Sequence, residues 1–191
     1  MLTEEKINSN YATFIEKLSN IGVNTEPLIK FIGEDKLKKA TYALNADSGM
    51  AFDGSLIYFC LCKIAKLSIL INNQVFSSIR VNQDSLLKVS LLHQISKSIM
   101  FEENDSQWEK ANRGLLYKYS KLEGALRCGE RSAYICLKCG VDLTPEEFEA
   151  MKIIDKDNDD NYSKYFSSPL SLILKSAVDL TVAESRINYK K

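Results

Sequence analysis

Residues 85–100, SLLKVSLLHQISKSIM, form the stretch around which the rest of the chain is predicted to pack. Their apolar side chains cover most of a helical surface, which is typical of a helix buried on nearly all sides. Asn82 is a suitable N-cap for this helix. The stretch contains His93, the single histidine of the chain, and a buried imidazole costs free energy unless it finds a hydrogen-bond partner. His93 is therefore either a satisfied core residue or part of a site.

The composition favours a globular protein over a nucleic-acid-binding one. The chain has 191 residues, of which 45% are hydrophobic and 26% charged, so it is long enough to bury the core of one domain. Lys+Arg and Asp+Glu are both 25, and the formal net charge is zero. Such a chain has no long-range field to attract nucleic acid or an anionic membrane. We therefore expect no nucleic-acid partner.

Neither a signal peptide nor a membrane span is predicted. Residues 1–6, MLTEEK, do not lead into an apolar signal core. The most apolar window, residues 56–71, is interrupted by Lys63, Lys66 and Ser68. Five cysteines, an odd number, without an export signal favour a reducing compartment. We expect a cytoplasmic protein that does not associate with membranes.

Apolar residues at three- and four-residue spacing predict helices along most of the chain, and therefore an all-α fold. The clearest start signals are a capping box with proline at the first helical position, TPEE at 144–147, and Ser168-Pro169. Weak alternation in residues 104–122 is compatible with a short β-hairpin insert. The other predicted helices begin at Thr3 and Thr25 and cover 54–73, 85–100 and 130–139, with an irregular segment at 36–54.

Several segments, taken in order, resemble motifs of the HD-domain superfamily of metal-dependent phosphohydrolases, in particular the HD proteins of phages and low-GC bacteria. LLHQISK at 91–97 resembles LLHD-x-x-K, and CGERSAYI at 128–135 resembles HGE[KR]S. The other matching segments are DGSLI at 53–57, WEKANRGLLYKY at 108–119 (the family's tryptophan strand and turn), LTPEEFEAM at 143–151 and PLSLILKSAVDL at 169–180. The resemblance implies a single HD-like helical domain over 1–191, with a core at 53–182 and an N-terminal helical extension at 1–50. It also implies that a phage encodes the protein and that the protein acts in the host cytoplasm.

In that family, histidines and aspartates from separate helices hold one or two metal ions that activate water against a phosphoester. His93 and Asp179 match two of these ligands, and Lys97 matches the family's lysine. The remaining ligand positions are occupied by Phe59, Gln94, Cys128 and Ile154. His93 and Asp179 alone cannot hold a catalytic metal with an open coordination position. We therefore expect a catalytically degenerate domain without metal, cofactor or catalytic residues, in which these seven residues form a vestigial pocket.

The state of the pocket and its function remain open at this point. In one form, Phe59 and Ile154 fill the pocket and leave a buried His93–Asp179 pair. In the other, His93 and Lys97 still hold a small anion or a nucleotide phosphate. We expect a pseudoenzyme that binds a protein partner or a nucleotide-like molecule. The alternative is an active metal-dependent nucleotide phosphohydrolase, with a metal site rebuilt from His93, Asp179 and either Cys128 or Asp155.

Two further motifs have simpler interpretations. Cys136 and Cys139 form a C-x-x-C pair at the end of a helix, but a zinc site lacks a fourth ligand there and a reactive thiolate requires a helix start. We interpret these cysteines as buried thiols. Residues 155–166, DKDNDDNYSKYF, imitate the first half of a calcium loop. Asp160 stands where the loop requires glycine and Phe166 where it requires glutamate, so a solvated acidic turn is the better interpretation.

Overall fold

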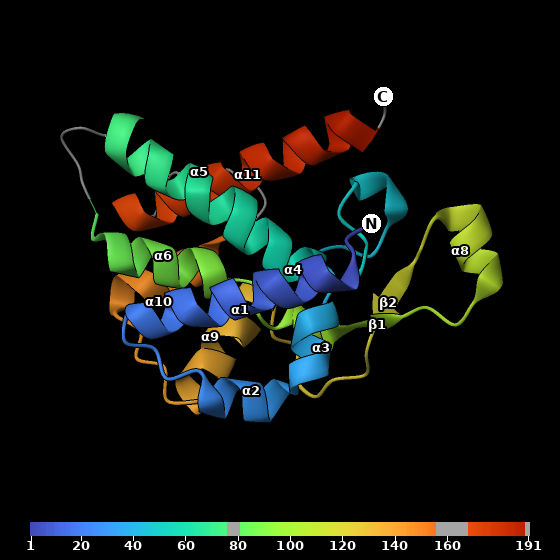
Figure 1. Ribbon diagram of the computed structural model, residues 1–191, viewed down its shortest axis with the longest axis horizontal. Coiled ribbons are helices and arrows are strands. Elements are labelled where there is room, and N and C mark those ends of the chain that lie inside the picture. The colour runs from blue at the N-terminus through green and yellow to red at the C-terminus, as the bar shows by residue number, and fades with distance from the viewer. Residues whose placement is uncertain (76–80, 156–167, 190–191) are drawn as a thin grey trace.

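The computed structural model describes residues 1–75, 81–155 and 168–189 (Figure 1). Helices account for most of these residues, which confirms the predicted all-α class. The elements in chain order are α1 (Glu4–Asn20), α2 (Glu26–Ile32), α3 (Glu34–Lys39), η1 (Ala46–Ser48), α4 (Ser55–Tyr58), η2 (Phe59–Ile64), α5 (Ala65–Leu70), η3 (Ile71–Val75), α6 (Gln83–Leu92), α7 (Lys97–Met100), β1 (Phe101–Glu103), α8 (Gln107–Arg113), β2 (Tyr117–Tyr119), α9 (Cys128–Lys138), α10 (Pro145–Ile153) and α11 (Pro169–Tyr189).

Side chains cap the first turns of the helices at the predicted places. Asn82 Oδ1 accepts the N–H groups of Asp84 and Ser85 at the start of α6, at 2.8 and 3.1 Å. At the start of α10, Thr144 Oγ1 accepts the N–H of Glu147 at 3.2 Å, and Glu147 Oε2 accepts the N–H of Thr144 at 2.9 Å. This reciprocal pair is the predicted capping box. Local sequence therefore determines where these helices begin.

The stretch 85–100 does not form the single helix that its apolar spacing predicts. Its central residues are buried, as predicted, but residues 93–96 form tight turns between α6 and α7. Ser96 fixes this break against α9. Its Oγ donates to the carbonyl oxygen of Cys128 at 2.8 Å, and its N–H donates to Ser132 Oγ at 3.1 Å. The prediction of a continuous helix was wrong because these bonds to a distant helix compete with the helical pattern.

The predicted long apolar helix is present as the run α4, η2, α5 and η3, from Ser55 to Val75. Its segments η2 and η3 are π-helical, a feature that apolar spacing did not indicate. By length and composition alone, Ser55–Gln74 could cross a bilayer, but 61% of its most apolar window is buried inside the fold. The core helix of a soluble protein has both properties.

The expected β-hairpin is present, but its two strands enclose a helix (Figure 1). β1 and β2 pair antiparallel with Phe101 opposite Tyr119, so the strands only partly overlap the predicted 104–122. Trp108 lies in α8 and not in a strand, which corrects the placement implied by the motif resemblance. The cause is local, because Ser106 Oγ caps α8. We call β1, α8 and β2 together the β-arm.

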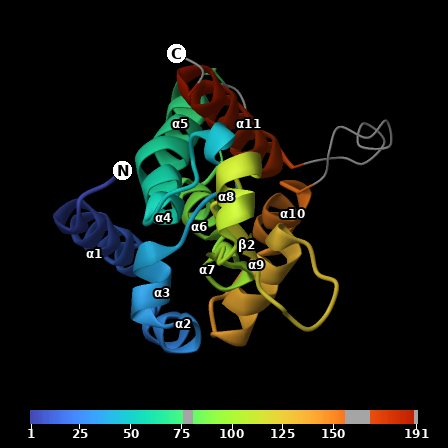
Figure 2. The same cartoon turned by 90° about the vertical axis from the view of Figure 1, so that its right-hand side faces the viewer.

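One hydrophobic core joins the N-terminal helices to the rest of the bundle. Phe14 and Leu18 of α1 belong to the same buried cluster as Leu92 of α6 and Leu174 of α11. α6 lies at the centre and packs against α5, α9 and α10, while α11 packs along α5 and α10 (Figures 1 and 2). The N-terminal extension therefore shares its core with the region that resembles an HD domain.

Candidate ligand-binding site

A cavity of about 990 Å³ lies where the 42–50 segment, the turn after α6, the start of α9, the end of α10 and the face of α11 meet. This volume is in the range of small-molecule sites. The residues of the predicted pocket that line the cavity are Gln94, Lys97, Cys128, Ile154 and Asp179. We call it the Lys97 cavity. Its walls come from segments far apart in the sequence, so only the folded chain brings these residues together.

The ammonium of Lys97 is one of several charged groups in the lining of the cavity. Nζ donates to the carbonyl oxygen of Tyr42 at 2.6 Å and lies 3.9 Å from the centre of the Tyr42 ring. Burial lowers the pKa of Lys97, an effect that the nearby Cys128, Cys60 and Asp155 partly oppose. Among the residues that the structure describes, no carboxylate forms an ion pair with Lys97. The ammonium thus keeps donors that a ligand could use.

Two buried polar groups in the lining of the cavity lack hydrogen-bond partners within the described ranges. Gln94 is 6% exposed, and its Oε1 has no donor. Tyr42 is 3% exposed, and its hydroxyl has no partner. Burial raises the pKa of Tyr42 well above its ordinary value, so the hydroxyl stays neutral and can donate. Sequence reasoning missed Tyr42, because it lies in the segment that was expected to be irregular and matches no motif.

His93 lies behind the cavity and does not line it. Its ring is fully buried, and Nδ1 lies 3.2 and 3.0 Å from the carbonyl oxygens of Val89 and Ser90. Because carbonyls only accept, Nδ1 carries the proton, and Nε2 is left without a partner in the described part of the chain. Burial, together with the charge of Lys97, lowers the pKa of His93 to about 3, so the ring is neutral.

The buried His93–Asp179 pair that one form of the pocket requires is not formed. Asp179 lies at the rim of the cavity, where its carboxylate pairs with Lys175 Nζ at 3.3 Å and its side chain is 58% exposed. Lys175 and Asp179 are one turn apart on α11, and this spacing favours their ion pair. His93 is satisfied on one side by carbonyls of its own helix. Each partner therefore bonds within its own helix.

Phe59 and Ile154 differ in their relation to the cavity. Phe59 lies in the π-helical segment η2, and its ring packs 5.6 Å from Tyr42, 6.1 Å from Phe52 and 5.1 Å from Tyr58, measured between ring centres. It is 5% exposed and does not line the Lys97 cavity. Ile154 does line it. The aromatic cluster supports the wall that carries Tyr42, and the cavity remains open above it.

Cys128 and Asp155 lie where the start of α9 meets the end of α10. Cys128 Sγ lies 3.2 Å from Ser96 Oγ, and burial raises the pKa of this thiol. The carboxylate of Asp155 accepts the N–H of Gly129, and Arg127 Nη1 donates to the backbone oxygen of Asp155 at 3.4 Å. Burial raises the pKa of Asp155. Arg127, Cys128 and Asp155 all line the cavity.

These residues do not fit the metal that an HD domain would carry. Over the described ranges, no three His, Cys, Asp or Glu side chains lie close enough together to hold a metal ion. The positive charge of Lys97 stands near the candidate ligands Cys128 and Asp155, and a dication placed there would be repelled. Burial raises the pKa of Cys60 to about 12, so this thiol is not a thiolate ligand. No metal-dependent step follows from this arrangement.

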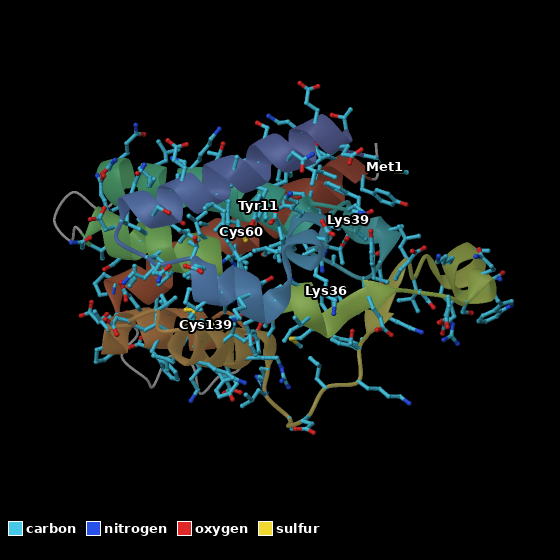
Figure 3. The ribbon with its side chains drawn as sticks, turned by 60° about the horizontal axis from the view of Figure 1, so that its bottom comes forward. Met1, Tyr11, Lys36, Lys39, Cys60 and Cys139 are labelled. Carbon is cyan, nitrogen blue, oxygen red and sulfur yellow. The ribbon has the colours of Figure 1, made fainter. Side chains whose placement is uncertain are left out.

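The two remaining motifs show no site in the part of the chain that is described. All five cysteines are free thiols, with Cys60 inside the bundle and Cys139 at the end of α9 (Figure 3). Burial raises the pKa of Cys136 to about 12, as expected of a buried structural thiol. In the calcium-like segment 155–166, residues 156–166 lie outside the described residues. Asp155 itself bonds to the start of α9.

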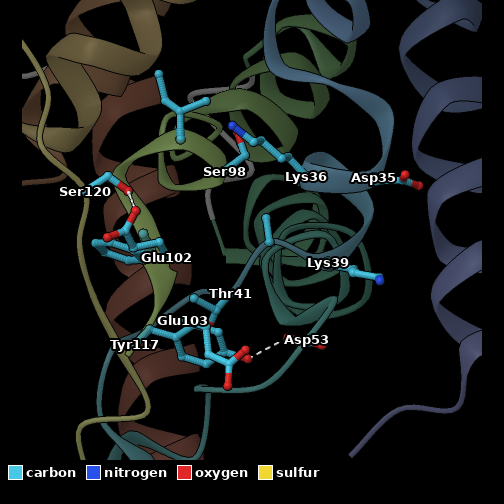
Figure 4. A pocket seen from close by; sticks show the side chains of 13 residues that line it. Asp35, Lys36, Lys39, Thr41, Asp53, Ser98, Glu102, Glu103, Tyr117 and Ser120 are labelled. Carbon is cyan, nitrogen blue, oxygen red and sulfur yellow. Dashed lines mark hydrogen bonds between the residues drawn. The ribbon is translucent and has the colours of Figure 1, made fainter. Parts of the chain in front are cut away.

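A second hollow, of about 450 Å³, lies between α3 and the β-arm (Figure 4). We call it the Tyr117 pocket. The Tyr117 hydroxyl donates to Asp53 Oδ1 at 2.7 Å, and Ser120 Oγ donates to Glu102 Oε2 at 3.2 Å. Burial and the bond to Asp53 raise the pKa of Tyr117. Two hydrogen bonds in the lining of this pocket therefore pair polar groups with one another.

No protein-family model, no curated protein and no solved structure matches the chain. Any functional assignment therefore rests on the groups in the Lys97 cavity and on the motif resemblance. Lys97 offers donors there, and two other lining residues, Tyr42 and Gln94, carry polar atoms without partners in the described part of the chain. Such a set suits an anionic ligand that also carries hydrogen-bonding groups.

Proposed function

We propose that the chain is a degenerate HD-like domain that binds a nucleotide-like anion in the Lys97 cavity without catalysing a metal-dependent reaction. One observation carries the proposal. A half-buried ammonium with no carboxylate partner among the described residues lies in the same cavity as two polar groups without partners in that part of the chain, on Gln94 and Tyr42. Desolvated charges are costly unless they are paired, and an anionic ligand would pair this one.

The position of the cavity supports the HD-like part of the proposal. The motif resemblance places ligand residues on separate segments that are distant in the sequence. The corresponding positions Gln94, Cys128, Ile154 and Asp179 line one cavity. A different arrangement of the helices is not expected to place these four positions around one cavity. Their side chains are no longer a metal-binding set, which supports binding over hydrolysis.

Two aromatic residues in the lining of the cavity support a ligand with a flat aromatic part. Phe101 and Tyr119 lie in the lining, and their rings meet edge to face with centres 5.3 Å apart. Tyr119 is 64% exposed, so a base could stack on it. Arg127 and Arg186 also line the cavity and add cations suited to phosphate. A phosphate near Lys97 and a base near Tyr119 describe one nucleotide-like ligand.

The test is calorimetric titration with nucleoside mono-, di- and triphosphates in the presence of EDTA. We expect binding by the wild type and at least tenfold weaker binding by Lys97→Met, a loss of about 1.4 kcal/mol. Lys118→Met is the matched control, because Lys118 pairs with Asp105 at 2.7 Å on the β-arm, and it should bind as the wild type does.

Two results would overturn the proposal. One is the absence of binding by a folded wild type, which would favour the protein-partner alternative. The other is phosphate release that requires Mn²⁺ and is lost in His93→Ala and Asp179→Ala, which would establish the rebuilt phosphohydrolase. The fold of each variant is checked by circular dichroism.

A further inference from the structure

We infer that Asp155 occupies an anion subsite of the Lys97 cavity in the free protein, and that the acidic group of a ligand binds by displacing this carboxylate. The inference rests on the proposed binding function and adds that a carboxylate of the protein itself competes with the ligand for this subsite. The carboxylate of Asp155 accepts the N–H of Gly129 in the first turn of α9. Asp155 thus holds the place that an external anion would take.

The start of α9 is suited to an anion by its geometry. α9 is an 11-residue helix, and the N–H groups of a first turn have no partner within the helix and carry partial positive charge. The N–H of Arg127 already donates to Glu130 Oε2 at 3.3 Å. The N–H of Gly129 is directed instead to the side chain of Asp155. The positive end of this helix therefore already holds two internal carboxylates, Glu130 and Asp155, of which Asp155 lines the cavity.

Gly129 is what allows the end of α10 to reach this position. A Cβ at residue 129 would overlap with the carbonyl oxygen of Met151 and would also lie 3.1 Å from Asp155 Oδ2. Glycine thus permits a close approach of two backbones. The approach carries Asp155 over the first turn of α9, at the edge of the cavity.

A second, independent observation indicates that the cavity is built for a ligand. Gln94 is only 6% exposed and lines the same cavity. Its amide oxygen has no partner in the described part of the chain. The hydroxyl of Tyr42 is likewise buried and unpartnered. Asp155 satisfies Gly129 but neither of these groups. The internal carboxylate therefore fills one part of the site and leaves the rest unsatisfied.

Charge explains why a ligand would have to displace Asp155. The positive charge of Lys97 acts on Asp155, and a phosphate that approaches Lys97 would face the carboxylate as a like charge. The other acidic residues of the lining are differently placed, because Asp179 pairs with Lys175 at the rim and Asp47 is exposed to solvent. A ligand that replaces Asp155 gains the N–H of Gly129 and removes the repulsion. Competition of this kind lowers the apparent affinity of the wild type.

The test compares pyrophosphate binding, in EDTA, by the wild type, Asp155→Ala, Asp155→Asn and the control Asp105→Asn, because Asp105 pairs with Lys118 on the β-arm and does not line the Lys97 cavity. We expect Asp155→Ala to bind pyrophosphate at least tenfold more tightly than the wild type. Asp155→Asn should fall between them, because it loses the charge but keeps an acceptor for Gly129. Asp105→Asn should stay within twofold of the wild type. In addition, the amide resonance of Gly129 should move when pyrophosphate binds, and this can be read in the well-folded Asp155→Asn protein if Asp155→Ala is unstable.

The outcomes separate the two hypotheses. If the wild type binds anions through Lys97 but Asp155→Ala and Asp155→Asn bind no more tightly, the competitor role is overturned and the binding function stands. Weaker binding by both variants would make Asp155 a positioning residue and would also overturn it. If neither the wild type nor any variant binds pyrophosphate or a nucleotide, both hypotheses fail.

Discussion

The Lys97 cavity and the Tyr117 pocket are both lined by polar side chains, but they differ in whether these side chains form hydrogen bonds. In the Tyr117 pocket, Tyr117 donates to Asp53 and Ser120 donates to Glu102. In the Lys97 cavity, Gln94 Oε1 and the Tyr42 hydroxyl have no partner among the described residues. An unsatisfied buried group costs about 1–3 kcal/mol. The difference teaches that unsatisfied polarity, more than polarity itself, distinguishes a hollow built for a ligand from one that closes on itself.

The largest expected effect comes from His93, which adds a further unsatisfied atom behind the Lys97 cavity. Its pKa is lowered from 6.5 to about 3, so the unfolded chain binds a proton at a pH where the folded chain does not. Stability due to neutral His93 is therefore present above pH 6.5 and is lost as the pH falls toward 3. The total loss is roughly 5 kcal/mol. Urea denaturation at pH 7 and at pH 4.5 measures about half of this loss, roughly 2.6 kcal/mol, because pH 4.5 lies near the middle of the range.

His93→Asn is the matched variant, because an asparagine amide can donate to the same carbonyls and does not titrate. We expect its stability to fall less than that of the wild type between pH 7 and pH 4.5, while all other titrating groups contribute equally to both proteins. Equal losses in the two proteins would mean that His93 reaches water or a partner in solution. The contrast between the two hollows would then be weaker.

The next largest effect is expected at Gly129, which follows the lining residues Arg127 and Cys128 of the Lys97 cavity in the chain and lines neither hollow. In Gly129→Ala the new methyl group would collide with the backbone oxygen of Met151, and neither backbone can move freely. We expect the free energy of unfolding to fall by about 3 kcal/mol, at the upper end of overpacking effects, measured by urea denaturation.

Gly22→Ala is the control for this substitution. Gly22 has a φ of 78° but nothing within 4 Å of an added Cβ. It should lose only about 1 kcal/mol, from its left-handed backbone. A similar loss at both glycines would show that α9 and α10 can separate, and would remove the close approach that holds Asp155 over α9.

The parts of the fold that could be predicted from sequence are those with local causes. Asn82 and Thr144 cap the helices they were expected to cap, because each needs only the next three residues as partners. The long apolar helix was likewise readable from its spacing. The break at residues 93–96 was not, because it depends on bonds from Ser96 to a helix more than 30 residues away.

The same division applies to the site. The motif resemblance placed Gln94, Lys97, Cys128, Ile154 and Asp179 in one pocket together with His93 and Phe59, but only the first five line the Lys97 cavity. It could not indicate Tyr42, whose carbonyl holds Lys97, since a backbone acceptor leaves no trace in the sequence. The i,i+4 spacing of Lys175 and Asp179 allowed their ion pair, but the resemblance did not indicate that Asp179 would form it in preference to a bond with His93. Which of several partners a side chain chooses depends on the packed structure.

The smallest effect is expected in the Tyr117 pocket, where the prediction is a loss of stability without a loss of binding. Tyr117→Phe removes the hydroxyl that donates to Asp53 at 2.7 Å, and we expect the free energy of unfolding to fall by about 1 kcal/mol. Nucleotide and pyrophosphate affinity should remain within twofold of the wild type, because Tyr117 does not line the Lys97 cavity. A tenfold loss of affinity in this variant would place ligand contacts in the Tyr117 pocket. A pocket whose polar groups are hydrogen-bonded to one another could then still bind a ligand, and hydrogen-bond satisfaction would not distinguish the two sites.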